Sequence, residues 1–211
     1  MSEVTMPEAE QALMLKFYRK ARIILEYGSG SSTCVAASLP GKLVMSVESD
    51  LTWARDLRAE LSQGDNPSQV VVYHVDIGET GPWGRPVNEA RWRQYHRYPN
   101  AIWSESFFRH PDVILIDGRF RTACLASAMM QITQPVTVLF DDYVSRPKYR
   151  LVERMIRPCE IVGRMARFEI NPGQLPAEQF GFAIAQFFEV SLHGKGHTDY
   201  EVPSARDETP E

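Results

Sequence analysis

The sequence has few cysteines and no long apolar run. Its three cysteines, Cys34, Cys124 and Cys159, are far apart and form no Cys-x-x-Cys pair, which argues against a disulfide framework or a zinc site. We interpret them as small buried thiols in a reducing compartment. No stretch approaches the roughly 20 apolar residues of a transmembrane helix, and residues 1–11 lack a signal peptide's apolar core. The sequence therefore predicts a cytoplasmic protein with no membrane partner.

An excess of positive charge is also absent. The 211 residues include 23 basic and 27 acidic side chains, giving a formal net charge of −4. Proteins that bind a phosphate backbone usually carry a basic face, so nucleic acid is not the expected partner. The length suits one domain, which we place at residues 1–193. From residue 194 the chain is polar and charged, and we expect a flexible tail over 194–211.

Five short runs of aliphatic and β-branched residues alternate with segments of helical length. The runs cover residues 22–27, 43–48, 70–76, 113–117 and 136–142. The expected helices cover residues 8–20, 32–39, 51–61, 122–132 and 148–156. Near-continuous apolar strands suit a parallel sheet covered on both faces. The pattern predicts an α/β fold with a doubly wound, mostly parallel sheet.

Residues 160–171 and 180–190 hold the remaining candidate elements. They predict either two antiparallel strands or a hairpin at Gly163-Arg164 followed by a helix. In both cases an antiparallel strand lies near the C-terminus.

A glycine-rich turn follows the first predicted strand. Gly28 and Gly30 stand between that strand and a helix opened by serine and threonine, and Glu26 precedes them. Glycines allow sharp turns and let a ligand approach the backbone. Glu48 ends the second strand, where a carboxylate can bind both hydroxyls of a ribose. The turn therefore predicts a site for a nucleotide-like ligand.

This turn resembles the first motif of the class I S-adenosylmethionine (SAM)-dependent methyltransferases, which reads acidic-x-Gly-x-Gly. Glu26, Gly28 and Gly30 match it, and Ser32 stands where many members have a third glycine. Dinucleotide-binding enzymes instead require G-x-G-x-x-G, and Thr33 occupies the last glycine position. The resemblance implies a Rossmann-like methyltransferase fold that binds SAM.

Further acidic residues at strand ends extend the resemblance over residues 20–145. Glu48 matches the acid that binds the ribose, Asp76 the acid near the adenine, and Asp117 an acid near the transferred methyl group. Asp117 is therefore the implied catalytic residue. The cofactor-binding residues implied are Glu26, Tyr27, Gly28, Ser29, Gly30, Thr33, Glu48, Asp76 and Asp117.

Carboxylates also end the fourth and fifth strands. Asp117, Asp141 and Asp142 would meet at one sheet edge and suit Mg²⁺, which prefers oxygen ligands. The arrangement resembles the metal-dependent catechol and caffeoyl-type O-methyltransferases, with Asp142 in place of their Asn. The alternative is that Asp142 caps a helix and that Arg119 or Arg121 pairs with Asp117, which removes the need for a metal.

Residues 78–110 form a long insertion rich in aromatic side chains, interleaved with arginines. We interpret it as a lid over the bound cofactor, with a glycine-rich hinge at 78–84. The aromatic side chains would bind a planar or anionic acceptor, stack on exposed bases, form the lid's own core, or line a homodimer surface. They are Trp83, Trp92, Tyr95, Tyr98, Trp103, Phe107 and Phe108. His74, His96 and His110 are candidate bases, none with a visible partner.

The resemblance implies an enzyme, a transferase that moves a methyl group from SAM to a small-molecule acceptor. A SAM-binding module without catalysis is the alternative. An NAD-dependent oxidoreductase is disfavoured by the motif.

Overall fold

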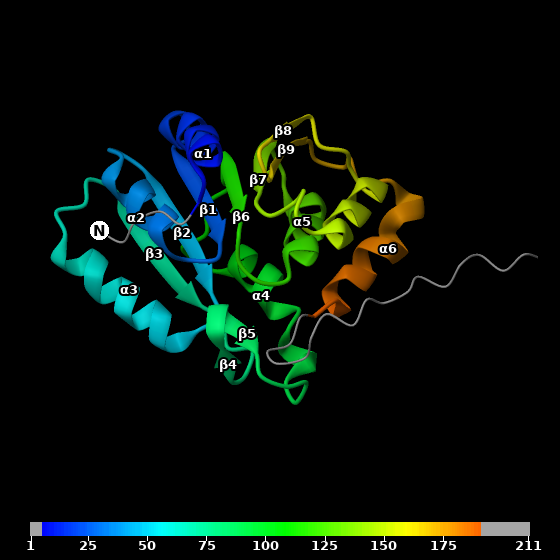
Figure 1. Ribbon diagram of the computed structural model, residues 1–211, viewed down its shortest axis with the longest axis horizontal. Helices are drawn as coiled ribbons and strands as arrows, with labels where there is room; N and C mark the ends of the chain where they lie inside the picture. The colour runs from blue at the N-terminus through cyan, green and yellow to red at the C-terminus, as the bar shows by residue number, and fades with distance from the viewer. Residues whose placement is uncertain (1–5, 191–211) are drawn as a thin grey trace, which may run out of the picture.

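The computed structural model describes residues 6–190, which form a seven-stranded sheet flanked by helices (Figure 1). The strand order is β3-β2-β1-β6-β7-β9-β8. The parallel strands are β1 (Ile23–Tyr27), β2 (Leu43–Glu48), β3 (Gln69–His74), β6 (Val113–Ile116) and β7 (Val136–Phe140). β9 (Met165–Ile170) runs antiparallel to β7, and β8 (Glu160–Val162) antiparallel to β9. The predicted doubly wound, mostly parallel sheet is confirmed.

The helices follow the predicted alternation with small shifts at their ends. The α-helices are α1 (Glu8–Lys20), α2 (Ser31–Ser38), α3 (Leu51–Gln63), α4 (Arg97–Asn100), α5 (Arg121–Gln131) and α6 (Phe180–Ala185). Short 3₁₀ helices cover Pro82–Gly84, Trp92–Gln94, Ala101–Ser104, Pro147–Arg154, Ala177–Gln179 and Gln186–Phe188. The helix expected over 148–156 is thus a 3₁₀ helix that ends earlier. The hairpin at Gly163-Arg164 followed by a helix is the C-terminal alternative that the structure contains.

The central strands are buried on both faces, as their apolar composition predicts. Leu25 and Tyr27 of β1 join the larger core cluster, which includes Leu125 and Met129 of α5. Ile24, between them, joins the second cluster with Leu13 and Met14 of α1. Side chains alternate across a strand, so a continuous apolar run serves both layers.

The strand order reverses between β1 and β6. From β1 the chain continues through β2 to β3 on one side, and it returns at β6 on the other side of β1. In doubly wound sheets, ligands bind in the crevice at the carboxyl ends of the strands flanking this point. The ends of β1 and β6 carry the glycine turn and Asp117 respectively. The topology therefore brings both predicted features to one place.

The insertion at 78–110 is only partly a surface segment. β4 (Thr80–Gly81) pairs with β5 (Arg85–Pro86), and the following turns lead into α4. Tyr95 and Tyr98 are buried in the main core, whereas the Trp83 side chain is 78% exposed. The alternative in which the aromatic side chains form the lid's own core is therefore wrong for these tyrosines, because they join the main core of the protein. A lid formed by residues 78–110 stays a prediction.

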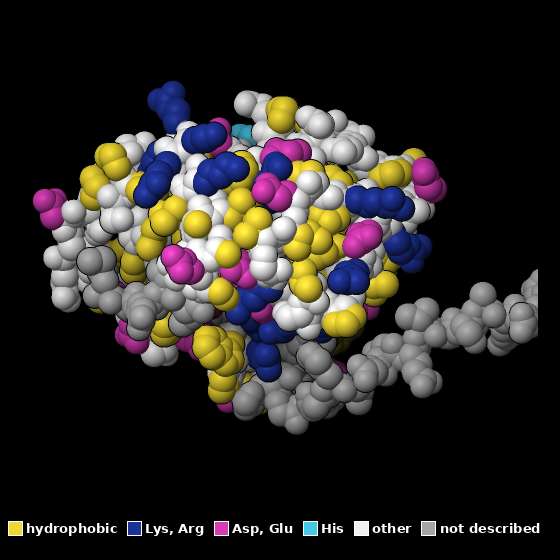
Figure 2. Space-filling model, turned by 45° about the horizontal axis from the view of Figure 1, so that its top comes forward, with side chains coloured by type: hydrophobic (Ala, Val, Ile, Leu, Met, Phe, Trp, Pro, Cys, Tyr) yellow, Lys and Arg dark blue, Asp and Glu magenta, His cyan; other side chains and the backbone are white. Residues whose placement is uncertain are grey.

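The cysteines, the surface charges and the helix lengths each bear on an expectation from the sequence. Cys124 is buried, but Cys34 is half-buried and Cys159, at the start of the β8–β9 hairpin, is exposed, so the expectation of buried thiols is wrong for two of the three. Basic and acidic side chains are interspersed on the face shown in Figure 2. Among residues 6–190, no helix combines the length and apolar character of a membrane span. The predicted tail over 194–211 lies outside the described residues.

Candidate functional site

Two glycines join the carboxyl ends of β1 and β6. Gly28 has φ +102°, and a Cβ atom there would lie 2.6 Å from Gly118 Cα. A Cβ atom on Gly118 would in turn lie 2.8 Å from Gly28 Cα. Neither position leaves room for a side chain, so the two backbones are in direct contact. Gly30 differs, because its nearest neighbour is Trp53, 3.9 Å from the Cβ position.

Glu26 supports the glycine turn from inside the protein. Its side chain is fully buried and accepts hydrogen bonds from Tyr18 Oη, at 2.7 Å, and from Thr33 Oγ1. Thr33 Oγ1 also accepts the Gly30 N–H at 3.0 Å. Burial raises the pKa of Glu26, while the hydroxyl donors oppose that rise. Glu26 and Thr33 thus lie beneath the turn and outside the pocket lining.

Tyr27 is likewise an internal residue. Its hydroxyl donates to the Pro99 carbonyl at 2.7 Å and accepts from Trp103 Nε1 at 2.8 Å. These bonds attach the inserted segment to the end of β1. Any contact of Tyr27 with a ligand in the pocket would therefore be through its backbone.

A pocket of about 400 Å³ opens over the glycine turn. Its floor is the turn from Gly28 to Ser32, and its walls come from the ends of β2 and β6 and from the inserted segment. The lining residues are Met6, residues 28–32, residues 48–50, Trp53, residues 81–84, Tyr98 and residues 117–119. A cavity of this size suits a nucleotide-sized ligand.

Glu48 lies in the wall of this pocket and orders the backbone around it. Its Oε2 accepts the Ser29 N–H at 3.2 Å, and its Oε1 accepts the N–H groups of Ser49 and Asp50 at 2.7 and 2.8 Å. Burial raises the pKa of Glu48, and these backbone donors oppose the rise. The predicted ribose-binding acid thus meets the predicted glycine turn.

Trp53 was not identified by sequence reasoning. It lies in the first turn of α3, where Asp50 caps the helix by accepting the Trp53 N–H at 2.9 Å. Its Nε1 donates to the Ser29 carbonyl at 2.8 Å, while its half-exposed side chain lines the pocket. The signal was available in the sequence, since an aromatic residue in the turn after a ribose-binding acid is well placed to stack on a ligand.

Asp76 lies apart from the rest of the predicted site. Its Oδ1 accepts the Gly78 N–H at 2.8 Å, and Arg91 lies 3.8 Å from its other oxygen. The side chain is 55% exposed and does not line the pocket. The predicted contact with adenine therefore stays a prediction.

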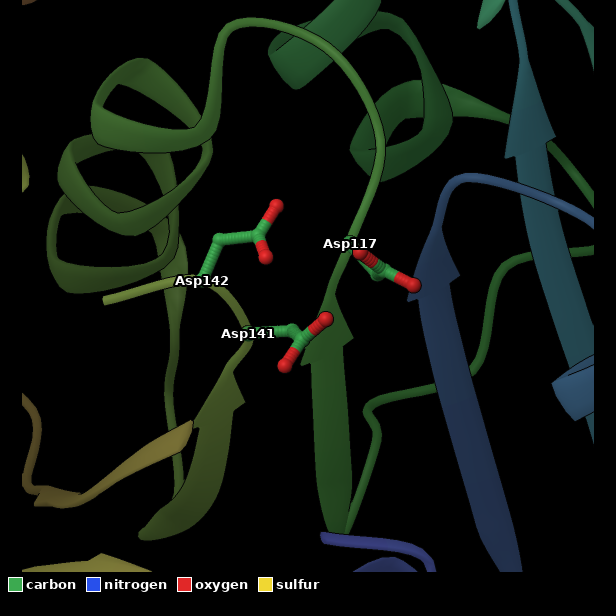
Figure 3. Close-up of side chains that lie close together, drawn as sticks. All are labelled: Asp117, Asp141 and Asp142. Carbon is green, nitrogen blue, oxygen red and sulfur yellow. The ribbon is translucent and has the colours of Figure 1, made fainter. Parts of the chain in front are cut away.

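Asp117, Asp141 and Asp142 meet at the carboxyl ends of β6 and β7, as expected (Figure 3). One oxygen of each lies within 4.8 Å of the others. Asp141 is fully buried, and Asp142 adopts a positive φ of 58° in the turn after β7. The predicted convergence of carboxylates is confirmed.

Arginines pair with all three carboxylates. Arg164 binds Asp141 through two bonds of 2.7 and 3.0 Å. Arg121 lies 2.9 Å from Asp117 and 3.2 Å from Asp142, and Arg146 lies 3.1 Å from Asp142. Three guanidinium groups thus balance three carboxylates, and a divalent cation would have to displace them. The arrangement does not fit a metal, and it matches the alternative in which Arg121 pairs with Asp117.

Asp117 faces the pocket and has an altered acidity. Burial raises its pKa to about 6; Arg121 opposes the rise, and the neighbouring Asp141 and Asp142 carboxylates add to it. A carboxylate with this pKa can exist in either protonation state near neutral pH.

The candidate histidine bases lie elsewhere. His110 Nε2 accepts the N–H groups of Thr133 and Gln134, and His96 is exposed on the insertion. Within the described part of the chain, no histidine lines the pocket.

Comparisons with known proteins place the chain in a family. No protein-family model matches it, and no curated protein matches it. A methyltransferase-like protein from Silicibacter pomeroyi is 46% identical, with a TM-score of 0.82, over 89% of this chain and 97% of that chain.

Two more distant structures share the fold. The O-methyltransferase TomG from Streptomyces achromogenes, solved in complex with SAM, is 16% identical with a TM-score of 0.54, over 81% of this chain and 82% of that one. A putative caffeoyl-CoA O-methyltransferase from Staphylococcus aureus is 13% identical with a TM-score of 0.50, over 80% and 85%. The chain therefore belongs to the methyltransferase-like family that the Silicibacter pomeroyi protein represents, and its fold is that of the class I methyltransferases.

Proposed function

We propose that this protein binds SAM in the pocket over the glycine turn and transfers its methyl group to a small-molecule acceptor. One observation carries the proposal. Gly28, Gly30, Glu48 and Asp117, which the methyltransferase motifs single out, come from three strand ends and line one pocket at the switch point of the sheet.

Different residues of the pocket would bind different parts of SAM. Gly30 leaves the backbone accessible, and the first turn of α2 presents N–H groups to the ligand. Glu48 offers its carboxylate to the ribose hydroxyls while holding Ser29 in place. Trp53 provides an apolar wall for stacking. Glu26 and Thr33 position the turn without lining the pocket.

Bound SAM supplies a methyl group already activated by the sulfonium, so the protein needs no nucleophile of its own. The remaining tasks are to align the acceptor and to remove its proton. Asp117 lies in the pocket wall and is suited to accept the proton of an acceptor hydroxyl or amine. Because the three carboxylates are paired with arginines, the proposal includes no metal.

A thermal-shift panel of SAM, S-adenosylhomocysteine, NAD and NADP tests the cofactor. A ligand at 100 times its Kd stabilises the folded state by about 2.7 kcal/mol, which corresponds to roughly 5–10 °C for a chain of this size. We expect S-adenosylhomocysteine to produce such a shift and the nicotinamide cofactors to produce none. A Gly30→Asp variant, which fills the pocket and adds charge near Glu48, serves as the control and should lose the shift. A response to NAD alone would refute the proposal.

A second measurement separates an enzyme from a binding module. The protein is incubated with methyl-labelled SAM and a metabolite extract, and label in small molecules is compared with a boiled control. Binding of S-adenosylhomocysteine without transfer of label would favour a module.

A further inference from the structure

A second cavity, of about 190 Å³, adjoins the cofactor pocket. Gly118 and Arg119 line both cavities, so the two are separated only by the turn after β6. The second cavity is also lined by residues of the Pro147–Arg154 helix and of α6. A molecule held there would meet the first pocket at this shared wall.

The lining of the second cavity is strongly cationic. Arg119, Arg121, Arg146 and Lys148 all contribute to it, against the single carboxylate of Glu189. Arg121 and Arg146 are already paired with Asp117 and Asp142, and neither acid lines the cavity. Arg119 forms no ion pair with an acid among residues 6–190. Its buried Nε finds no hydrogen-bond partner among residues 6–190.

The cations also repel one another. Burial lowers the pKa of Arg119, and Arg121 and Arg85 lower it further. Burial and then Arg146 lower the pKa of Lys148, with Glu189 opposing them. An anion in the cavity would reduce this repulsion, because an opposite charge favours the charged form of each group.

The remaining lining is aromatic and small. Phe120, Tyr149 and Phe182 border the cavity, and the guanidinium carbons of Arg121 and Arg146 each lie 5.8 Å from the Tyr149 ring centre. Protein cavities of about 150 Å³ accept a benzene-sized molecule, so a cavity slightly larger holds one substituted ring. Aromatic faces together with guanidinium groups favour a planar anion.

We infer that this second cavity is the acceptor site and that the acceptor is a small aromatic carboxylate bearing a hydroxyl group. The inference rests on the proposed function. The carboxylate lies among Arg119 and Lys148, and the hydroxyl reaches past Gly118 toward Asp117. The acceptor oxygen forms the new bond to the methyl carbon, and the carbon–sulfur electron pair returns to sulfur. The hydroxyl proton passes to Asp117. The products are a methyl ether and S-adenosylhomocysteine.

Calorimetry with S-adenosylhomocysteine bound provides the test. The probes are 4-hydroxybenzoate and 3,4-dihydroxybenzoate, each compared with its uncharged counterpart, phenol and catechol. A hydrogen-bonded charge contributes about 1.5–3 kcal/mol, so the carboxylates should bind roughly 10- to 100-fold more tightly. Label from SAM should also appear on 3,4-dihydroxybenzoate.

Two variants that change the charge of the cavity in opposite directions test the inference further. Lys148→Gln removes a cation and should weaken 4-hydroxybenzoate severalfold, whereas Glu189→Gln removes the opposing acid and should strengthen it. Neither residue lines the cofactor pocket, so both variants should bind S-adenosylhomocysteine as the parent does. Equal affinity for carboxylates and their uncharged counterparts, with S-adenosylhomocysteine bound, would overturn the acceptor inference. Failure to bind S-adenosylhomocysteine at all would instead overturn the proposed function.

Discussion

Glu26 and Glu48 lie at the ends of neighbouring strands but act in different surroundings. Glu26 is fully buried and held by Tyr18 and Thr33, while Glu48 borders the pocket and holds Ser29. The register pairs Glu26 with Ser46, two residues before Glu48, so the two carboxylates lie on the same face of the sheet. They differ because Glu48 ends β2 at the pocket, whereas the Tyr18 hydroxyl of α1 reaches Glu26 inside the protein. The two carboxylates therefore predict different mutational effects.

Replacing Glu48 by Gln should weaken S-adenosylhomocysteine binding. The variant loses the charge that accepts the Ser29 N–H and faces the ribose, and hydrogen bonds to charged groups contribute about 1.5–3 kcal/mol, or roughly 10- to 100-fold in affinity. Calorimetry of the variant measures the change. Glu60→Gln, at an exposed position of α3, is the matched control and should bind as the parent does. Equal affinity of all three proteins would remove Glu48 from the site.

The raised pKa of Asp117 predicts the pH dependence of methyl transfer. The base must be ionised to accept a proton, so the active fraction grows as the pH rises through about 6. We expect kcat/KM for the acceptor to rise between about pH 5 and pH 7 and then to level off. Rate measurements across this range test the sign, and Asp117→Asn should abolish the rise. A rate that falls over this interval would exclude Asp117 as the base.

At the scale of elements, the two glycines of the turn have separate tasks. Gly28 allows the ends of β1 and β6 to touch, whereas Gly30 borders open space. Gly28→Ala combines a strained positive φ with a backbone clash and should cost about 2 kcal/mol or more, which lowers the Tm by roughly 4–8 °C. Gly30→Ala should retain the parent Tm but bind S-adenosylhomocysteine less tightly. Thermal melts and calorimetry on both variants test these two predictions. An equal loss of Tm in the two variants would contradict them.

Arg121 connects the ends of β6 and β7. Besides its two carboxylates, it donates to the carbonyls of Gly118 and Asp141 at 3.1 and 2.7 Å. Removing one partner of a buried ion pair costs about 3–5 kcal/mol, and partial exposure of Asp117 reduces this to roughly 2–3 kcal/mol for Arg121→Met.

The same variant also tests the absence of a metal. Removing Arg121 leaves Asp117 without its arginine, while Arg164 and Arg146 still pair with Asp141 and Asp142. Millimolar Mg²⁺ should therefore raise the Tm of Arg121→Met while leaving the parent and an exposed control, Arg55→Met, unchanged. Stabilisation of the parent by Mg²⁺ would show that the arginines do not replace a metal.

At the scale of the molecule, the inserted segment joins the core and the pocket. Tyr98 is buried against β1 and Phe120, while residues 81–84 border the pocket. We expect hydrogen exchange to show slow exchange in β1, β6 and β7 and faster exchange in residues 80–86. S-adenosylhomocysteine should slow exchange in residues 28–33 and 80–86 and leave the β8–β9 hairpin unchanged. No change in residues 80–86 would contradict their part in a lid.

The succession of strands and helices, the glycine turn and the acids at the strand ends could all be predicted from the sequence. These features are encoded locally, by apolar periodicity and by residues that directly follow a strand. Which of the acids line the pocket depends instead on tertiary packing. The Glu26 side chain lies inside the protein and binds Tyr18, whereas the Asp76 side chain is exposed beside Arg91.

The ion pair between Arg164 and Asp141, which are 23 positions apart, could not be predicted from the sequence either. It forms because the β8–β9 hairpin lies against β7. The cationic cavity likewise combines the turn after β6 with two C-terminal helices. Such contacts join residues distant in the chain, and no local pattern specifies them.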